Sequence, residues 1–156
     1  MSSTTLSMSH EAMDRVLEEH FRQEAEGDVA GTLATYTEDV VHDVVGDPMG
    51  TLHDRQSIGK RYAQLFSNVR GESSAVKHRL YGDDFVVDDK IWTARVDGEF
   101  LGVPGHGRRI HVRVLHVFEF RDGLISRENV WLDGASALAQ LRGDDPLAAG
   151  AGETRA

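Results

Sequence analysis

Hydrophobic and polar residues alternate with two different periods along this chain, and the change of period divides it in two. From residue 10 to about residue 66, apart from the valine-rich stretch 40–46, apolar residues recur every three or four positions, which is typical of amphipathic helices. From residue 73 onward they recur at every second position, which is typical of strands with one buried face. Helices followed by a run of antiparallel strands predict an α+β domain, in which the helices cover one face of a curved sheet.

Three helices are predicted in the first part. The first begins after Ser9, which suits an N-cap, and its apolar stripe includes His20. The second begins after Gly27-Asp28 and the third after Asp54. The three stripes are Met13, Val16, Leu17, His20 and Phe21; Val29, Leu33 and Tyr36; and Ile58, Tyr62, Leu65 and Phe66.

Four strands are predicted in the second part, at 74–81, 85–97, 109–120 and 123–132, and a short helix at 135–141 follows them. In the third of these strands His116 falls on the same face as Val112, Val114 and Phe118, so it is expected to point into the core. We assign one domain to residues 10–142, between a flexible N-terminus at 1–9 and a disordered tail at 143–156.

Four of the seven residues from Val40 to Gly46 are valines, with His42 and Asp43 between them, and the stretch predicts a buried strand. Alternation sends His42 and Asp43 to opposite faces of the sheet, so one of them meets an apolar environment. A carboxylate there is costly unless it is paired, and burial raises its pKa toward that of a useful base. The pattern alone does not choose between the two, because valines lie on both faces.

Composition excludes several classes of function. No apolar run approaches the ~20 residues of a membrane span. A net charge of −9 with a single Arg-Arg pair does not suit a nucleic-acid partner. There is no cysteine, the spacing of the histidines does not indicate a metal site, and no cofactor motif is found. We therefore expect a cytoplasmic, cofactor-independent protein without a bound metal.

Arg95 and Asp97 lie two apart in the predicted strand 85–97 and so share a face of the sheet. One interpretation is a solvated ion pair of little energetic value. The other is catalytic, with Arg95 orienting an ionised Asp97 that activates a water molecule.

Several local strings resemble the nuclear transport factor 2-like superfamily, and in particular its SnoaL-like polyketide cyclases and ketosteroid isomerases. They are Tyr36-Thr37-Glu38-Asp39, the segment 98–104 before Gly107-Arg108-Arg109, and Val117-Phe118-Glu119-Phe120-Arg121-Asp122-Gly123. The resemblance covers roughly residues 10 to 140. It implies a cone-shaped α+β barrel, with helices packed on a strongly curved mixed or antiparallel sheet around an apolar pocket, and it implies a homodimer.

The resemblance also suggests roles for single residues. Asp43 is similar in position to the general base of ketosteroid isomerases, although Val44 replaces their proline. His20 falls where those isomerases carry the tyrosine of the oxyanion hole, and His116 falls where they carry a protonated aspartate. SnoaL-like cyclases often have a histidine at the position of His116.

Two departures separate this chain from its relatives. SnoaL-like cyclases and limonene epoxide hydrolases carry a catalytic aspartate in the final strand, where alignment by eye places Val130, next to Asn129. Limonene epoxide hydrolases also resemble this chain in their Arg-x-Asp pair at Arg95 and Asp97, but their third acid is missing here.

These observations lead to three hypotheses. The first is a cofactor-independent enzyme in which Asp43 removes a proton α to a carbonyl, while His116 and His20 stabilise the enolate oxygen. The second is epoxide hydrolysis through Arg95 and Asp97. The third is a non-catalytic protein that binds a small hydrophobic ligand. The residues expected to line the pocket are Met49, Phe66, Trp92, Phe100, Phe118, Asn129 and Trp131.

Overall fold

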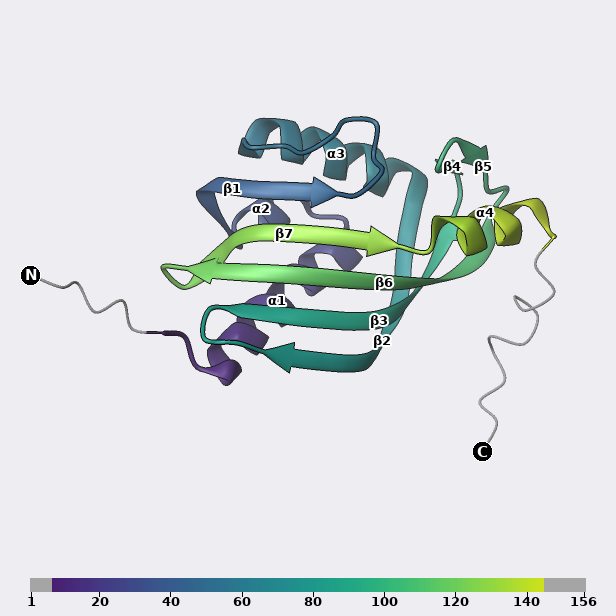
Figure 1. The fold of residues 1–156 in the computed structure, drawn as a ribbon. Coiled ribbons are helices and arrows are strands. Elements are labelled where there is room, and N and C mark those ends of the chain that lie inside the picture. The colour runs from purple at the N-terminus through teal and green to yellow at the C-terminus, as the bar shows by residue number, and fades with distance from the viewer. Residues whose placement is uncertain (1–6, 145–156) are drawn as a thin grey trace, which may run out of the picture.

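The computed structural model describes residues 7–144, and Figure 1 shows helices packed on one face of a curved sheet. In chain order the elements are α1 (His10–Glu26), α2 (Val29–Leu33), β1 (Tyr36–Val44), α3 (Arg55–Asn68), β2 (Val69–Tyr81), β3 (Phe85–Val96), β4 (Glu99–Phe100), β5 (Val103–Pro104), β6 (Arg108–Arg121), β7 (Leu124–Leu132) and α4 (Gly134–Arg142). Most of the predicted N-terminal segment 1–9 and of the predicted tail 143–156 lies outside the described residues.

The predicted helix starts are confirmed by their capping bonds. The side chains of Ser9, Asp28 and Asp54 accept a hydrogen bond from the backbone N–H three residues further on in α1, α2 and α3. The second helix is shorter than its apolar spacing predicts, because Tyr36 belongs to β1 and points into the core.

Five strands form one sheet in the order β1-β7-β6-β3-β2, while β4 and β5 form a separate hairpin. β1 pairs with β7 in parallel, and the other pairs of the large sheet are antiparallel. The α+β class is thus confirmed, but the sheet is strongly curved and open rather than closed as a barrel.

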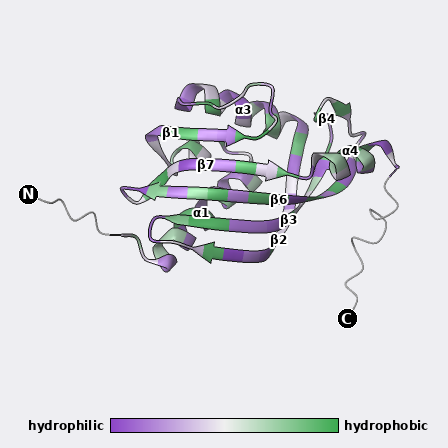
Figure 2. Cartoon of the chain, in the orientation of Figure 1, coloured by the Kyte–Doolittle hydropathy of each residue, from purple (hydrophilic) through white to green (hydrophobic). Residues whose placement is uncertain are grey.

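Hydrophobic and hydrophilic residues both occur along each strand of the sheet (Figure 2), and the alternation of buried and more exposed residues on β3, β6 and β7 gives the sheet an inner face and an outer face. On β6 every second residue from Ile110 to Phe120 is buried. The buried apolar residues form two clusters. One gathers around Met13, Tyr36 and Phe118, and the other around Ile110, Val112 and Leu141. The space between these clusters is where a site can form.

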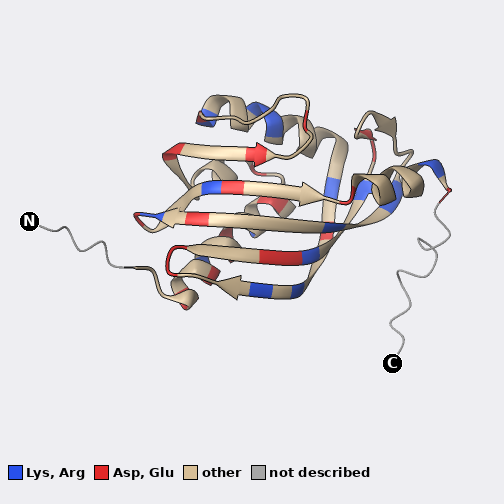
Figure 3. Ribbon diagram, viewed as in Figure 1, with Lys and Arg blue, Asp and Glu red and all other residues tan. Residues whose placement is uncertain are grey.

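Charged residues gather at the turns at one end of the sheet (Figure 3). Asp83 and Asp84 lie between β2 and β3, and Asp122 lies between β6 and β7. Among the described residues, no helix is both long and apolar enough to cross a bilayer.

The hairpin β4–β5 is held against β3 by the close approach of Gly105. A Cβ atom added at Gly105 would lie 2.3 Å from both the Cβ and the carbonyl oxygen of Val96. We therefore expect Gly105→Ala to lower the free energy of unfolding by about 1–3 kcal/mol in urea denaturation. Gly134→Ala is the matched control, because its added Cβ would meet nothing closer than 3.5 Å. Equal stability of the two variants would contradict this account.

Candidate active site

An interior cavity of about 790 Å³ lies between the inner face of the sheet and the helices α1 and α3. Its walls are mainly apolar and include Phe66, Trp92, Phe100 and Val114. Titratable side chains also line it, namely Glu24, His42, Asp47, Arg61, Tyr62, Glu72, Lys90, Glu99, His116 and Glu128. An apolar cavity with a few convergent polar groups is the usual form of a small-molecule site.

Glu128 on β7 is the centre of the polar groups and is only 1% exposed. The Tyr36 hydroxyl donates a hydrogen bond to its Oε2 atom, and the Tyr62 hydroxyl lies 2.7 Å from that of Tyr36. Burial opposes the charge of Glu128, but His20, together with His42 and His116, lowers its pKa below the ordinary value. The carboxylate is therefore ionised at neutral pH.

His20 on α1 is a fully buried cation that balances this carboxylate. Its Nε2 atom lies 3.2 Å from Glu24 Oε1 and 3.3 Å from Glu128 Oε2. The hydroxyl of Thr35 donates to the Thr32 carbonyl, so Thr35 Oγ1 accepts the 2.8 Å hydrogen bond from His20 Nδ1. Burial opposes protonation, but Glu24 and Glu128 raise the pKa of His20 to about 10.

His42 on β1 faces the cavity, with its Nε2 atom 3.9 Å from Glu128 Oε2. Arg61 on α3 donates to His42 Nδ1 at 3.1 Å, which leaves the ring proton on Nε2. Burial and the charge of Arg61 lower the pKa of His42 despite the opposing charge of Glu128. His42 is thus a neutral hydrogen-bond donor at the cavity floor.

His116 on β6 lines the same cavity from the other side of β7. Its Nε2 atom lies 3.6 Å from Glu128 Oε1, and its ring stacks on Phe118 with centroids 5.1 Å apart. Burial and the charge of Lys90 lower the pKa of His116 to about 4. The imidazole is therefore neutral at pH 7, and its buried Nδ1 atom has no hydrogen-bond partner among the described residues.

The predicted orientation of β1 is wrong. His42 is buried on the inner face, whereas Asp43 is half-buried on the outer face and accepts a 3.3 Å hydrogen bond from Asn129. Valines lie on both faces of this strand, so the valine pattern carries no information about which face is inside. The parallel register settles it, because it pairs His42 with Glu128 and Asp43 with Asn129.

Arg95 and Asp97 lie away from the cavity and are not paired with each other. Arg95 bonds Glu72 and the carbonyl of Gly107, while the carboxylate of Asp97 accepts from Arg70. The inner face of β3 is formed by Val86, Asp88, Lys90 and the alternate residues that follow. Arg95 and Asp97 alternate with these residues and do not line the cavity. The structure therefore gives no support to water activation by this pair.

The predicted lining residues divide into two groups. Met49, Phe66, Trp92 and Phe100 line the cavity as expected. Three others do not: Phe118 is packed in the core, Asn129 lies on the outer face, and Trp131 is 41% exposed there. The error at Asn129 and Trp131 has one cause, because both alternate with the inward-facing Glu128, Val130 and Leu132.

Glu128, His42, Arg61 and Lys90 were not identified as site residues from the sequence. The signal for Glu128 is present, since it precedes Val130 and Leu132 by two and four positions on one strand face. The final strand therefore does carry a buried acid, two residues before the position that alignment by eye suggests. The signal for Lys90 is the same alternation with Trp92 and Val86.

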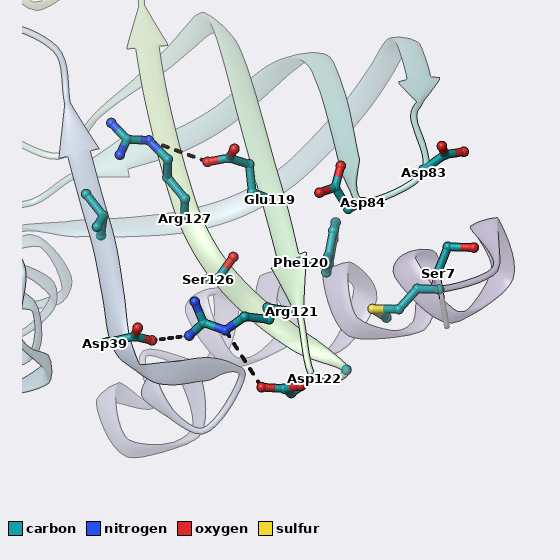
Figure 4. Close-up of a pocket in the computed structure, with 13 residues that line it drawn as sticks. Ser7, Asp39, Asp83, Asp84, Glu119, Phe120, Arg121, Asp122, Ser126 and Arg127 are labelled. Atoms are coloured by element: carbon teal, nitrogen blue, oxygen red, sulfur yellow. Dashed lines mark hydrogen bonds and ion pairs between the residues drawn. The ribbon is translucent and has the colours of Figure 1, made fainter. Parts of the chain in front are cut away.

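A second depression, of about 1120 Å³, lies at the turn end of the sheet (Figure 4). It is lined mainly by charged residues, five acidic and two basic, of which Arg121 pairs with Asp39 and Arg127 with Glu119. Both of its arginines are already paired with carboxylates, so we assign the site to the interior cavity, whose walls are mainly apolar.

Comparisons with known proteins identify the family and the fold of this chain. The sequence profile of a family described as a SnoaL-like domain matches residues 17–128. A search of curated proteins gives no match.

Three solved structures illustrate the likeness in fold. TsrD from Streptomyces laurentii has a TM-score of 0.74 at 20% identity, covering 88% of this chain and 99% of its own. A protein of Jannaschia sp. CCS1, described as a candidate SnoaL-like polyketide cyclase, has a TM-score of 0.72 at 18% identity, covering 94% and 99%. An LEH-like epoxide hydrolase of M. tuberculosis has a TM-score of 0.66 at 17% identity, covering 85% and 92%. These structures confirm the predicted fold.

Proposed function

This chain belongs to the SnoaL-like domain family, and on that basis we propose that it is an acid/base enzyme acting on a small apolar carbonyl compound. In this proposal Glu128 removes a proton from the carbon next to the carbonyl, as in an isomerase or cyclase reaction. The role that sequence comparison suggests for Asp43 passes to Glu128, because Asp43 lies on the outer face.

One observation carries the proposal: a buried, ionised carboxylate at the floor of an apolar cavity, with the Nε2 atoms of three histidines within 4 Å of it. A general base must be deprotonated before it can act, and the low pKa of Glu128 meets this condition at neutral pH.

The two carboxylate oxygens have different surroundings. Oε2 accepts from Tyr36 and lies 3.3 Å from His20, so it is the oxygen that fixes the side chain in place. Oε1 lies 3.6 Å from His116 Nε2, and no hydrogen bond to Oε1 is found among the described residues. We assign proton abstraction to Oε1, because it keeps lone pairs for a substrate proton.

His42 is the donor we assign to the carbonyl oxygen. Its Nδ1 is occupied by Arg61, so its Nε2–H is directed toward the carboxylate and the cavity. A donor placed where negative charge develops stabilises the enolate, and an oxyanion donor typically contributes about 10²–10³-fold in rate. His20, which the sequence suggested as such a donor, instead holds Glu128.

The proposed substrate follows from the walls of the cavity. A volume of about 790 Å³ with aromatic and aliphatic lining suits a ring-containing molecule of drug-like size. The names of the structural relatives include a candidate polyketide cyclase and an LEH-like epoxide hydrolase. The finer choice between isomerase and cyclase chemistry depends on the substrate.

Deuterium exchange tests the proposal without knowledge of the natural substrate. We expect the protein to catalyse exchange of the α-hydrogens of an apolar ketone such as 2-tetralone in D₂O, followed by proton NMR. Glu128→Gln should lower the rate by about 10²–10⁴-fold, because the general base is lost.

Asp43→Asn is the matched control, since it makes the same change from carboxylate to amide on the neighbouring strand, and it should exchange at the wild-type rate. Loss of exchange in Asp43→Asn with retention in Glu128→Gln would contradict the assignment. Binding of the ketone without exchange by the wild type would favour a ligand-binding protein instead.

A further inference from the structure

Lys90 on β3 is a lysine that lines the interior cavity and is only 4% exposed. Among the residues that the structure describes, Asp88 is the carboxylate that lies within ion-pair distance of its Nζ atom, although a buried ammonium group has three protons to donate. The sequence contains two other lysines, Lys60 and Lys77, and both are exposed. The buried lysine is therefore set apart from the other two by its surroundings.

The surroundings of Lys90 only partly compensate its charge. Its Nζ atom lies 3.4 Å from Asp88 Oδ2 and 2.9 Å from the centroid of the Phe21 ring. Asp88 is also the partner of Arg79, whose Nε donates to Oδ1 at 2.8 Å, so its negative charge is shared between two cations. A second carboxylate, Asp14, completes this chain of charges through Arg79.

Burial is the main influence on the amine. It lowers the pKa of Lys90 despite the opposing charges of Asp88, Glu24 and Glu128. A desolvated lysine in an apolar pocket is the form in which enzymes use lysine as a nucleophile.

We propose that Lys90 is the amine that condenses with the carbonyl group of the ligand and holds it in the cavity as an iminium ion. The proposal rests on the carbonyl substrate of the proposed function and adds a covalent step to it. It stands on the position of Nζ at a ligand-sized cavity, on its burial, and on its nearest carboxylate, Asp88, being shared with Arg79.

The atoms of this step balance without any further reactant. The unprotonated amine forms a C–N bond to the carbonyl carbon, and the carbonyl oxygen takes up the proton that the nitrogen gives up. The C–O bond of the resulting carbinolamine then breaks, and with one more proton the oxygen leaves as water. His42, whose Nε2–H is directed at the cavity, is placed to donate to this oxygen.

Condensation also answers a difficulty in the proposed reaction. The low pKa that keeps Glu128 ionised makes it a weak base, since the same neighbours that stabilise its charge reduce its affinity for a proton. An iminium group withdraws electrons from the adjacent carbon more strongly than a carbonyl does. A weak base then suffices to remove the α-proton. In this proposal Lys90 and Glu128 therefore act together in one cavity.

Reductive trapping tests this inference. The wild-type protein is incubated at pH 7 with a limiting amount of 2-naphthaldehyde and sodium cyanoborohydride, and the labelled lysines are identified by peptide mass spectrometry. We expect Lys90 to be labelled at least about tenfold faster than Lys60 and Lys77, because a lowered pKa leaves more amine unprotonated. Labelling of Lys90 no faster than that of the two exposed lysines would overturn the proposal.

Two sets of variants complete the experiment. Lys90→Arg keeps the positive charge but cannot form the iminium, so fast labelling should vanish, while Lys60→Arg and Lys77→Arg should retain it. Circular dichroism of each variant shows whether it is folded. Fast labelling in a folded Lys90→Arg would overturn the proposal.

Glu128→Gln separates this inference from the proposed function. Fast labelling with loss of α-exchange in this variant supports both roles. Wild-type exchange without fast labelling at Lys90 overturns the role of Lys90 alone, and fast labelling without exchange of any ketone overturns the role of Glu128 alone.

The labelling rate should also rise with pH and reach half its maximum at a lower pH for Lys90 than for Lys77. The groups that face Lys90 and set this midpoint are Glu24 on α1, Asp88 on β3, His116 on β6 and Glu128 on β7. A midpoint equal to that of Lys77 would overturn the proposal.

Discussion

Glu128→Leu is expected to lower the free energy of unfolding by about 3–5 kcal/mol, measured by urea denaturation at pH 7. The substitution leaves the His20 imidazolium buried beside Glu24 alone and removes the acceptor of the Tyr36 hydroxyl. A buried charge that loses its partner costs far more than the pair itself contributes, because the remaining charge stays desolvated.

Two further variants show whether this reason is correct. Glu119→Leu removes a carboxylate from β6 that is half exposed and pairs with Arg127 at 3.6 Å, so it should change stability little. The double variant Glu128→Leu/His20→Leu should recover part of the loss, because it removes the unpaired cation as well. A Glu128→Leu protein as stable as the wild type would show that the cluster does not hold the fold.

The free energy of unfolding is expected to be greatest near pH 6.5 and to fall on both sides, as two histidines have pKa values shifted in opposite directions. The pKa of His20 is raised to about 10, so its contribution is complete below pH 6.5 and is lost as the pH rises toward 10. The pKa of His116 is lowered to about 4, so its contribution is complete above pH 6.5 and is lost as the pH falls toward 4.

Each histidine accounts for a slope of up to about 1.4 kcal/mol per pH unit. Urea denaturation of His20→Gln from pH 4 to 10 should flatten the alkaline side of the profile, and His116→Gln should flatten the acidic side. His53→Gln is the control, because His53 is exposed and should leave both sides unchanged. Parallel profiles for all three variants would show that these two histidines do not govern the pH dependence.

Much of the fold follows from the sequence alone because its periodicities are regular. The change from a helical to an alternating period near residue 70 corresponds to the end of α3 and the start of β2. The caps at Ser9, Asp28 and Asp54 depend only on neighbouring residues, which is why they are correct. The sequence also predicts the orientation of His116 correctly. Every other residue of its strand from Ile110 to Phe120 is apolar apart from His116 itself, so the alternation alone places His116 on the buried face.

The cluster around Glu128 depends on pairing between segments that are distant in the sequence. Periodicity within one segment does not predict such pairing. Glu128 stands in the polar run Ser126-Arg127-Glu128-Asn129, so its local sequence resembles that of a solvated strand. It is buried because α1 and β1 supply His20, Tyr36 and His42 to its carboxylate. A phase error of one residue in β1 then exchanges His42 for Asp43 and moves the predicted base to the wrong face.

The parallel pairing of β1 with β7 has a consequence for the order of folding. It joins His42 to Glu128 across 86 residues of chain, so the strand that carries the proposed base docks only after nearly the whole domain has been synthesised. Contacts of such long sequence separation are slow to form, because the entropy of closing the loop is lost before the contact contributes. Nascent chains that end before residue 124 would therefore leave His20 and His42 without their carboxylate, and the buried charge cluster would be completed by β7, the last strand of the sheet to be synthesised.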